Sequence, residues 1–333
     1  MILAKHMIPW NNLSIFDIQT PQAFDQLALK IFKYQATNNL IYHKFITLLG
    51  ICIDDVKKIT DIPFLPIQFF KDYQVTTEKD YETIFKSSGT TGMQRSTHYI
   101  KDLALYKESF TKGFEYFYGS INEYSILALL PSYVAQGDSS LVYMVQNLIE
   151  QSQNKYSGFY LNEDEKLAKT LQKLNNEGKK TLLIGVSYAL LDLTEKYNFN
   201  LQNSIIMETG GMKGRRKELL REELHQVLQK SFGVKSIHSE YGMTELLSQS
   251  YSKGNGIFQS PPWQKILIRD TEDPFTYLEN GKTGGINIID LANIYSCSFI
   301  ATQDLGKKNT NGFEILGRFD HSDLRGCNLL IIK

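Results

Sequence analysis

Apolar side chains recur at helical spacing near the start of the chain, where Phe24, Leu27 and Ile31 fall on one helix face. Thr20-Pro21 comes just before them, and proline is common in the first turn of a helix. Residues 62–71 are also apolar, but two prolines in this segment oppose a helix. The pattern therefore predicts an amphipathic helical region up to about residue 60, followed by an extended apolar connector.

Helical and strand patterns alternate through the middle of the chain. Asp102 precedes a helix that carries the core aromatics Phe110, Phe114 and Phe117. Further helices are expected at residues 141–149, 164–177, 188–197 and 216–232, the last with Leu220, Leu224, Val227 and Leu228 facing inward. Strands are expected at residues 124–130, 181–184, 204–207 and 234–238. Such alternation predicts crossover connections and a parallel sheet that helices cover on both faces.

From Ile257 onward the pattern changes to short strands separated by turns such as Glu279-Asn280-Gly281. Strands are expected at residues 266–268, 285–290 and 295–301, which predicts a smaller β-rich subdomain. The chain is therefore expected to be an α/β protein. Its segments would be a helical part of the main lobe with its connector at residues 1–80, an α/β core at 81–256 and the β-rich subdomain at 257–333.

Composition excludes several classes of protein. The 333 residues carry 36 Lys and Arg against 36 Asp and Glu, so no general attraction to nucleic acid or to an anionic membrane is expected. No run of about 18 apolar residues predicts a membrane span. Met1 to Trp10 lacks the pattern of a signal peptide. Cys52, Cys297 and Cys327 lie far apart without metal-ligand spacing, and a reducing cytoplasm fits this cysteine usage.

The stretch between residues 87 and 92 is the first candidate for chemistry, because it consists of hydroxyl residues and glycines: Ser87, Ser88, Gly89, Thr90, Thr91 and Gly92. Glycine lets a ligand approach the backbone closely, and hydroxyls with free amides bind phosphate oxygens. A plain turn has the same composition, so this alternative stays open. The stretch is not a Walker A loop, because no Gly-Lys-Ser/Thr ending follows it.

Two further turns follow neighbouring strands of the predicted parallel sheet. Thr209-Gly210-Gly211 comes after one strand, and residues 240–245 (Glu-Tyr-Gly-Met-Thr-Glu) come after the next. Open parallel sheets bind ligands at the carboxyl ends of their strands. The two turns are therefore expected to meet at a ligand-binding edge.

Four segments, taken in order, resemble the motifs of the adenylate-forming superfamily, which includes acyl-CoA synthetases and insect luciferases. Residues 87–92 resemble its phosphate loop, and Tyr241-Gly242-Met243-Thr244-Glu245 matches its second signature. Residues 301–306 resemble its Thr-Gly-Asp motif, with Gln303 in place of the usual glycine. Residues 317–320 match its hinge motif, Gly-Arg-x-Asp.

The resemblance implies a site for ATP and Mg²⁺. Tyr241 would lie against adenine beside Thr209-Gly210-Gly211, and Gly242 belongs to the same motif. Thr244 would contact the α-phosphate, Glu245 would hold Mg²⁺, and Asp304 would bind the ribose hydroxyls with Arg318 beside it. The implied β- and γ-phosphate contacts are Ser87, Ser88, Thr90 and Thr91, with Gly89 and Gly92 shaping the loop. Lys86 and Arg95 are nearby cations that could neutralise phosphate.

The sequence stops at Lys333, soon after the hinge motif, so the C-terminal lid domain of the superfamily is expected to be absent. The chain resembles a branch without this lid, the acyl-protein synthetases of the LuxE type, over nearly its whole length. Residues 63–71 and Arg325-Gly326-Cys327 contribute to this match. The resemblance implies ATP-dependent activation of a fatty acid, transfer of the acyl group to Cys327 and a partner acyl reductase.

Alternative interpretations stay open at this point. Cys327 could simply be a small apolar residue that leads into a terminal strand, although Arg325 beside it favours a reactive thiolate. The chain could also be a ligase for coenzyme A or a carrier protein, of the phenylacetate-CoA ligase type, that uses a lid in trans. A third interpretation is that the chain is not an enzyme but a non-catalytic subunit that binds nucleotide or acyl groups.

Overall fold

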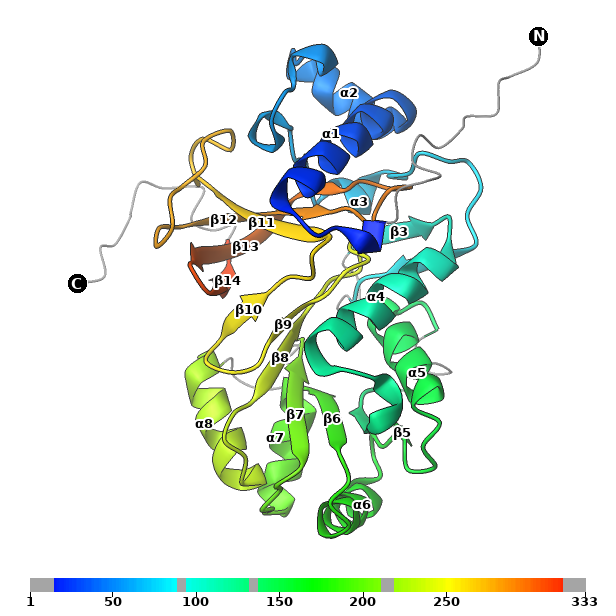
Figure 1. The fold of residues 1–333 in the computed structure, drawn as a ribbon, viewed down its shortest axis with the longest axis vertical. Coiled ribbons are helices and arrows are strands. Elements are labelled where there is room, and N and C mark those ends of the chain that lie inside the picture. The colour runs from blue at the N-terminus through cyan, green and yellow to red at the C-terminus, as the bar shows by residue number, and fades with distance from the viewer. Residues whose placement is uncertain (1–14, 89–93, 132–136, 211–218, 320–333) are drawn as a thin grey trace.

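A computed structural model describes residues 15–88, 94–131, 137–210 and 219–319 of the chain (Figure 1). Its α-helices are α1 (Pro21–Asn38), α2 (Leu40–Leu48), α3 (Phe69–Asp72), α4 (Leu103–Tyr118), α5 (Ser140–Ser152), α6 (Asp164–Asn176), α7 (Ser187–Lys196) and α8 (Arg221–Phe232). Its strands are β1 (Leu65–Pro66), β2 (Thr83–Lys86), β3 (Thr97–Ile100), β4 (Ser125–Leu129), β5 (Gly158–Phe159), β6 (Thr181–Val186), β7 (Ser204–Thr209), β8 (His238–Tyr241), β9 (Ser250–Ser252), β10 (Ile257–Gln259), β11 (Gln264–Arg269), β12 (Thr283–Asp290), β13 (Phe299–Asn309) and β14 (Gly312–Arg318). Across these ranges, no helix combines the length and the apolar character that a membrane span requires.

One sheet runs through the molecule in the strand order β11-β12-β13-β14-β10-β9-β8-β7-β6-β4-β5, with β1 paired to β13. The series β8-β7-β6-β4-β5 is parallel, as the alternating sequence pattern predicted. The remaining neighbours in the series β8 to β11 pair antiparallel. The C-terminal strands thus continue the parallel sheet through hydrogen bonds. The division of the chain at residues 80 and 256 stays a prediction.

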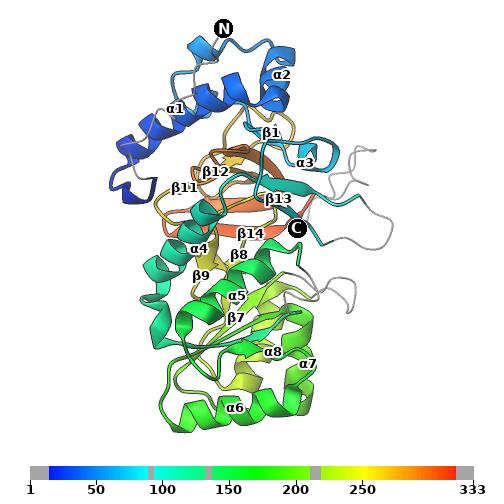
Figure 2. The ribbon, with the colours of Figure 1, turned by 90° about the vertical axis from the view of Figure 1, so that its right-hand side faces the viewer.

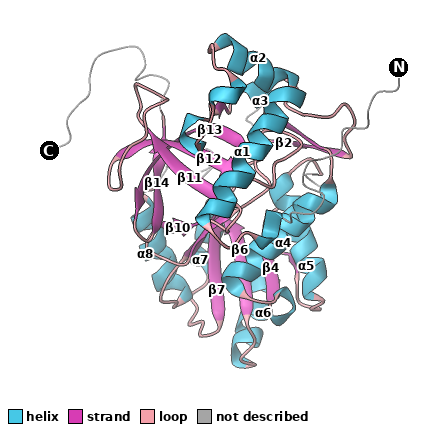
Figure 3. Cartoon of the chain, turned by 45° about the horizontal axis from the view of Figure 1, so that its top comes forward, coloured by secondary structure: helices cyan, strands magenta, loops and turns pink. Residues whose placement is uncertain are grey.

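Helices form layers on both sides of the parallel strands (Figures 1 and 2). Helices α4 and α5 lie on one face, and α7 and α8 lie on the other. Helix α1 crosses the antiparallel strands β11 to β13 instead (Figure 3). A separate hairpin of β2 and β3 carries the phosphate-loop candidate between its two strands. Both layers were expected from the sequence.

Side-chain caps begin the helices where the sequence predicted them. Thr20 Oγ1 accepts a hydrogen bond of 3.1 Å from Ala23 N at the start of α1, and Asp102 Oδ1 accepts one of 2.9 Å from Leu105 N in α4. Ser139 caps α5. Such caps satisfy backbone N–H groups that have no partner inside the helix.

Helix α8 differs from its prediction. The sequence predicted a helix that starts at residue 216 and has four apolar side chains facing the core. Leu219 and Leu220 are not helical, and α8 begins at Arg221. The expectation was right for Leu224 and Leu228, which are buried, but wrong for Leu220 and Val227, whose side chains are 72% and 44% exposed. The reason is that Leu220 has extended backbone before the first turn, so it lies outside the helical periodicity.

Three other boundaries also moved. The expected strand at residues 234–238 begins only at His238, because Val234 N donates a hydrogen bond to Gln229 O and so belongs to the C-terminal cap of α8. The strand expected from residue 295 begins at Phe299, because residues 290–298 form tight turns instead. The connector is extended only at β1, since both prolines precede Phe69 and leave α3 free to form.

Helix α1 is tied to the turns of residues 290–298 by its buried side chain Gln35. Gln35 Nε2 donates to the carbonyls of Asn293 (2.9 Å) and Ile294 (2.7 Å), and Gln35 Oε1 accepts from Ser298 N (2.9 Å). Asn39 Nδ2 adds a hydrogen bond of 3.0 Å to Ser296 O. These bonds satisfy the polar backbone of a buried turn, and they make α1 part of the same core as the site described below.

Two glycines at helix ends provide a test of the packing. Both Gly233 and Gly178 have positive φ, but a Cβ at Gly233 would lie 2.7 Å from Asn200 Cα, whereas a Cβ at Gly178 would meet no atom within 4 Å. Gly178→Ala should therefore lower the free energy of unfolding by about 1 kcal/mol through backbone strain alone. Gly233→Ala should lower it clearly more in urea denaturation. Equal losses in the two variants would contradict the close contact.

Candidate active site

The carboxyl ends of β6, β7 and β8 meet as the sequence predicted. Val186, Thr209 and Glu240 are neighbours across these strands, so the turns after β7 and β8 adjoin. Thr209 is 2% exposed, and its hydroxyl donates to the carboxyl group of Glu240. Burial, with a contribution from Glu208, raises the pKa of Glu240 to about 7, although the bond from Thr209 opposes the shift. Gly210 ends the described part of the first turn, and Gly211 lies outside the described residues.

Tyr241, Asp304 and Arg318 come from three strands and meet in one hydrogen-bonded cluster. The Tyr241 hydroxyl donates to Asp304 Oδ2 at 2.7 Å, and Arg318 Nε donates to Asp304 Oδ1 at 3.2 Å. Asp304 is 7% exposed, whereas the Arg318 side chain is 81% exposed. Burial and the neighbouring Asp304 raise the pKa of Tyr241 well above its ordinary value. The cluster therefore holds a carboxylate with one fixed partner and one partner at the surface.

Gln303, which stands where related motifs have glycine, fits regular strand geometry. In the described ranges, positive φ among non-glycine residues occurs at Gln153, Asn162 and Asn255, so Gln303 needs no left-handed backbone. Its carbonyl accepts a hydrogen bond of 2.8 Å from Phe319 N. The substitution therefore leaves the backbone around Asp304 intact.

Arg269 holds the same strand, β13, by hydrogen bonds. This role of Arg269 was not predicted from the sequence. Its guanidinium donates to Thr302 O at 2.6 Å and to Asn287 Oδ1 at 2.7 Å. It also lies 5.5 Å from the ring centroid of Phe319, at the end of the hinge motif. Arg269 thus fixes both β13 next to Asp304 and the residue that follows Arg318.

The base of the phosphate-loop candidate is closed by hydrogen bonds. Ser87 Oγ accepts from Ser96 N at 2.9 Å, and Ser87 N donates to Ser96 O at 3.0 Å. Arg95 pairs with Asp138 at 2.9 Å and donates to the carbonyls of Ser87 and Lys86. Arg95, considered above as a cation for phosphate, is therefore engaged with the loop's own base.

The tip of this loop is outside the described part of the chain. Ser87 and Ser88 are described, with Ser87 partly buried and Ser88 exposed. Gly89, Thr90, Thr91 and Gly92 lie outside the described residues, as does Cys327. The roles assigned to these residues stay predictions.

Glu245 is buried rather than a solvated surface acid, with 5% of its surface exposed. Burial raises the pKa of Glu245, while a hydrogen bond from Ser96 and the charges of Arg318 and Lys71 oppose the shift. Ser96 closes the phosphate-loop base, and Arg318 belongs to the Asp304 cluster. Glu245 shares the turn after β8 with Tyr241, whose hydroxyl donates to Asp304.

The backbone of Thr244 and Glu245 is held by a buried pair, His98 and Asn293, that sequence reasoning missed. His98 Nδ1 donates to Thr244 O at 2.7 Å, and His98 Nε2 lies 3.1 Å from Asn293 Oδ1. Asn293 Nδ2 donates to Glu245 O at 2.8 Å and to Cys297 O at 2.9 Å. His98 follows the phosphate loop on β3, so one imidazole joins that hairpin to the Thr244–Glu245 segment. The only signal in the sequence was a polar residue at an inward position of a short strand.

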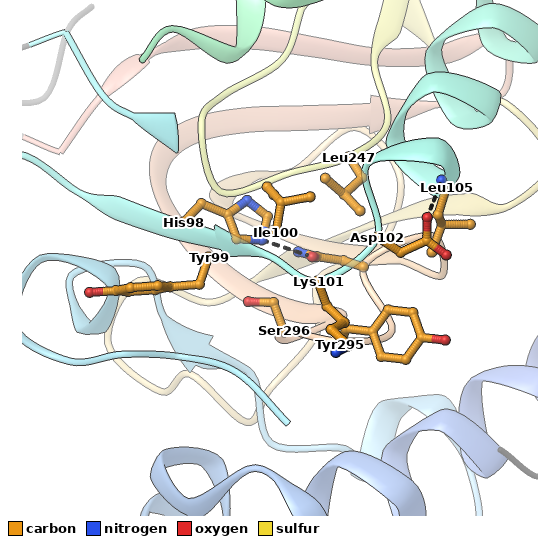
Figure 4. A pocket seen from close by; sticks show the side chains of 10 residues that line it. His98, Tyr99, Ile100, Lys101, Asp102, Leu105, Leu247, Tyr295 and Ser296 are labelled. Atoms are coloured by element: carbon orange, nitrogen blue, oxygen red, sulfur yellow. Dashed lines mark hydrogen bonds between the residues drawn. The ribbon is translucent and has the colours of Figure 1, made fainter. Parts of the chain in front are cut away.

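A small pocket opens beside this pair (Figure 4). His98, Asp102, Leu247 and Tyr295 are among the side chains that line it. None of the residues expected to bind nucleotide belongs to its lining. The residues Tyr241, Asp304 and Glu245, which were predicted to bind nucleotide, therefore lie outside this pocket.

No set of three or more histidine, cysteine or acidic side chains is arranged to hold a metal ion within the described ranges. The Mg²⁺ role expected of Glu245 stays a prediction, and the backbone carbonyl of Glu245 accepts the hydrogen bond from Asn293.

The family model described as "Acyl-protein synthetase, LuxE" matches residues 15–333. The comparison with curated proteins found no match. Among solved structures, a 2-hydroxyisobutyryl-CoA ligase with 2-HIB-AMP and CoA is similar with a TM-score of 0.67 at 12% identity, over 90% of this chain and 70% of the ligase. ATP-bound MatB from Rhodopseudomonas palustris has a TM-score of 0.54 at 18% identity, over 71% of this chain and 47% of MatB.

A long-chain-fatty-acid-CoA ligase from Archaeoglobus fulgidus gives a TM-score of 0.54 at 16% identity, over 72% of this chain and 52% of that ligase. This chain therefore spans about half the length of MatB and of the archaeal ligase. These likenesses establish the fold, which is the α/β fold of adenylate-forming ligases, as the sequence predicted.

Buried histidines should make the protein sensitive to acid. Burial lowers the pKa of His98 from 6.5 to about 4, so the unfolded chain takes up this proton first as the pH falls. The free energy of unfolding should decrease between about pH 6.5 and about pH 4, by up to about 3 kcal/mol for this residue. His98→Gln should show a smaller decrease in urea denaturation across this range.

His238 offers a matched comparison, because burial lowers its pKa to about 4 as well. The free energy of unfolding of the double variant His98→Gln/His238→Gln should depend less on pH than that of either single variant. If the free energy of unfolding falls with pH as steeply in all variants as in the wild type, neither imidazole ring is held neutral in the folded protein.

Proposed function

The chain belongs to the LuxE acyl-protein synthetase family, and we propose that it activates a carboxylic acid with ATP and transfers the acyl group to a protein thiol. The observation that carries this proposal is that the turn of residues 241–245 contacts both predicted halves of a nucleotide site. The Tyr241 hydroxyl donates to Asp304, and the Thr244 carbonyl accepts from His98 on the hairpin that carries the phosphate loop. In line with the resemblance stated above, we propose a fatty acid as substrate, a cytoplasmic location and an acyl reductase as partner.

The nucleotide would be held by residues on both sides of Glu245. Asp304 would accept hydrogen bonds from the ribose hydroxyls, which would replace the exposed side chain of Arg318 as its partner. Tyr241, fixed through its hydroxyl, would present its ring to adenine beside Thr209 and Gly210. Ser87 and Ser88, with the loop that follows them, would bind the β- and γ-phosphates.

In the first reaction, a carboxylate oxygen of the acid forms a bond to the α-phosphorus. The bond from that phosphorus to the oxygen that bridges to the β-phosphorus breaks, and pyrophosphate leaves. Thr244 would donate its hydroxyl hydrogen bond to the α-phosphate, since its carbonyl is already held by His98. Positioning and charge neutralisation account for most of the catalysis in such a displacement.

Mg²⁺ fits a site in which the protein provides one carboxylate ligand. When bound, the ion would neutralise charge on the phosphate oxygens. Glu245 would be its protein ligand. Burial raises the pKa of this carboxylate, because a charged group in the interior is unfavourable. Binding of the ion next to it would reverse that shift.

Pyrophosphate release with ATP, Mg²⁺ and a panel of carboxylic acids tests the proposal directly. Acid-dependent release supports an activating enzyme. Tight ATP binding without release for any acid would favour the non-catalytic binding subunit instead. Release that requires added coenzyme A or carrier protein would favour the ligase alternative.

Glu245→Gln should separate function from stability. Glutamine has nearly the same shape without the buried charge, so the melting temperature should be unchanged or higher. Pyrophosphate release should fall at least about tenfold, most clearly at low Mg²⁺, because the ion loses its carboxylate. Glu208→Gln is the control, since Glu208 is equally buried but faces Arg221 and His225 in the opposite helix layer. Wild-type turnover of Glu245→Gln at low Mg²⁺ would refute the metal assignment.

In the second reaction, a thiolate sulfur would attack the acyl carbonyl carbon and AMP would leave, which forms a thioester. Cys297 is unsuited to this role, because it is fully buried and burial raises the pKa of its thiol to about 12. Cys52 is exposed, in the N-terminal region. Cys327 is the cysteine that the family resemblance favours, and Arg325 beside it would stabilise the thiolate.

Cys327→Ser should still release pyrophosphate but should no longer carry an acyl group that hydroxylamine removes. Mass spectrometry of the intact protein after ATP, Mg²⁺ and labelled fatty acid measures this. Cys52→Ser is the control and should be acylated like the wild type. Label that persists in Cys327→Ser, or that maps to Cys52 or Cys297, contradicts the assignment.

A further inference from the structure

The hairpin of β2 and β3 lies outside the large sheet. Its two strands pair with each other, and within the described ranges no strand of the large sheet pairs with them. The hairpin carries Ser87 and Ser88, the proposed contacts of the β- and γ-phosphates. The contacts that hold the hairpin against the rest of the molecule therefore decide where these phosphates would lie.

His98 on β3 joins this hairpin to the turn after β8. It is 1% exposed, and its Nδ1 lies 2.7 Å from Thr244 O. A carbonyl oxygen can only accept a hydrogen bond, so Nδ1 carries the proton and donates it. The ring also packs edge to face on the buried ring of Phe70 in α3, with 5.6 Å between the centroids. The imidazole is thus held in one orientation by a hydrogen bond and by packing.

A short path leads from His98 back to the base of the phosphate loop. Ser96 is two residues before His98, which is at most about 7 Å along the chain. Ser96 N donates to Ser87 Oγ at 2.9 Å, and Ser96 O accepts from Ser87 N at 3.0 Å. Ser87 and Thr244 are therefore connected through the start of β3 and one imidazole.

The turn that contains Thr244 has supports of its own. Asn293 Nδ2 donates to Glu245 O at 2.8 Å, and Asp290 Oδ2 accepts from Leu247 N at 2.8 Å. Asp290 ends β12 and Asn293 lies just after it, so neither bond involves the hairpin. Loss of the His98 hydrogen bond would therefore leave the turn in place and release the hairpin from it.

The residues that His98 connects lie on opposite sides of the bond that would break in the first reaction. Thr244 is the proposed contact of the α-phosphate, and Ser87 and Ser88 are the proposed contacts of the leaving pyrophosphate. The displacement requires the attacking and leaving oxygens to be roughly in line with the phosphorus. A misplacement of about 1 Å can lower the rate of such a step about a hundredfold.

We propose that His98 is a positioning residue for acid activation, which holds the phosphate-loop hairpin against Thr244 so that the α-phosphate and the leaving pyrophosphate keep the relative position that the reaction needs. This inference rests on the proposed function, and it identifies a residue on which the first reaction depends. The competing explanation is that His98 only stabilises the fold.

Two substitutions of His98 separate these explanations. His98→Asn keeps an N–H donor close to the position of Nδ1, whereas His98→Gln moves the donor toward the position of Nε2, away from Thr244 O. His98→Gln should lower kcat for pyrophosphate release at least about tenfold through misplacement of the phosphates. His98→Asn should retain most of the wild-type kcat. The Kd for AMP should equal the wild-type value in both variants, because AMP has no β- or γ-phosphate for the hairpin to hold.

His238→Gln is the matched control. Burial lowers the pKa of His238 to about 4, as it does for His98, but the His238 ring contacts Tyr118 on α4. Its kcat and its Kd for AMP should equal those of the wild type. Phe70→Leu is a second test that does not depend on folding of His98→Gln. It keeps the imidazole but removes the ring packed against it, so kcat should fall while the Kd for AMP is unchanged.

The outcomes distinguish this inference from the proposed function. If kcat of His98→Gln equals that of the wild type, or if kcat and AMP affinity fall together in both His98 variants, His98 only stabilises the fold. The positioning role is then overturned while acid activation stands. If the wild type releases no pyrophosphate with any carboxylic acid, the proposed function fails and the positioning role with it.

Discussion

The buried carboxylate of Asp290 determines where the Thr244–Glu245 segment lies. It is fully buried and accepts hydrogen bonds from Leu247 N (2.8 Å), Ser248 N (2.9 Å), Ser248 Oγ (2.6 Å) and Ala292 N (3.2 Å). Burial raises the pKa of Asp290, and these donors oppose that shift. One side chain at the end of β12 thus holds the backbone just after Glu245. A buried carboxylate with several donors is costly to disturb, so this junction is rigid.

Successive contacts extend this junction to the rest of the site. Asn293, three residues after Asp290, holds the Glu245 carbonyl and meets His98 on the hairpin that carries the phosphate loop. Gln35 on α1 holds the carbonyl of Asn293 itself. The site therefore depends on a network that joins the turns after Asp290, the β2–β3 hairpin, the segment after β8 and helix α1.

Sequence patterns predicted the parts of this structure that depend on local physics. Thr20, Asp102 and Ser139 cap helices because capping needs only neighbouring residues. The meeting of Thr209 with residues 240–245 followed from the alternation of strands and helices alone. Individual roles at the site came only from the family resemblance, since one motif has many possible functions.

The contributions of His98, Asp290, Asn293 and Arg269 could not be predicted, because each depends on a partner remote in sequence. A similar reason explains the error at Val227, whereas Leu220 lies before the helix begins. Helical periodicity identifies an apolar stripe, but packing of α8 on the sheet decides which part of that stripe is covered.

The pairing of β1 with β13 has a consequence for how the protein folds during synthesis. Leu65 lies opposite Ile300, and the hydrogen bond from Gln35 to Asn293 joins residues 258 positions apart. The N-terminal helices therefore leave the ribosome long before their partners exist, whereas β4, β6 and β7 can pair as soon as they emerge. Contacts of such high contact order form slowly and leave apolar surface exposed in the meantime. The parallel strands β4, β6 and β7 are therefore expected to fold first, and the proposed nucleotide site is complete only when β13, which carries Asp304, pairs with β1.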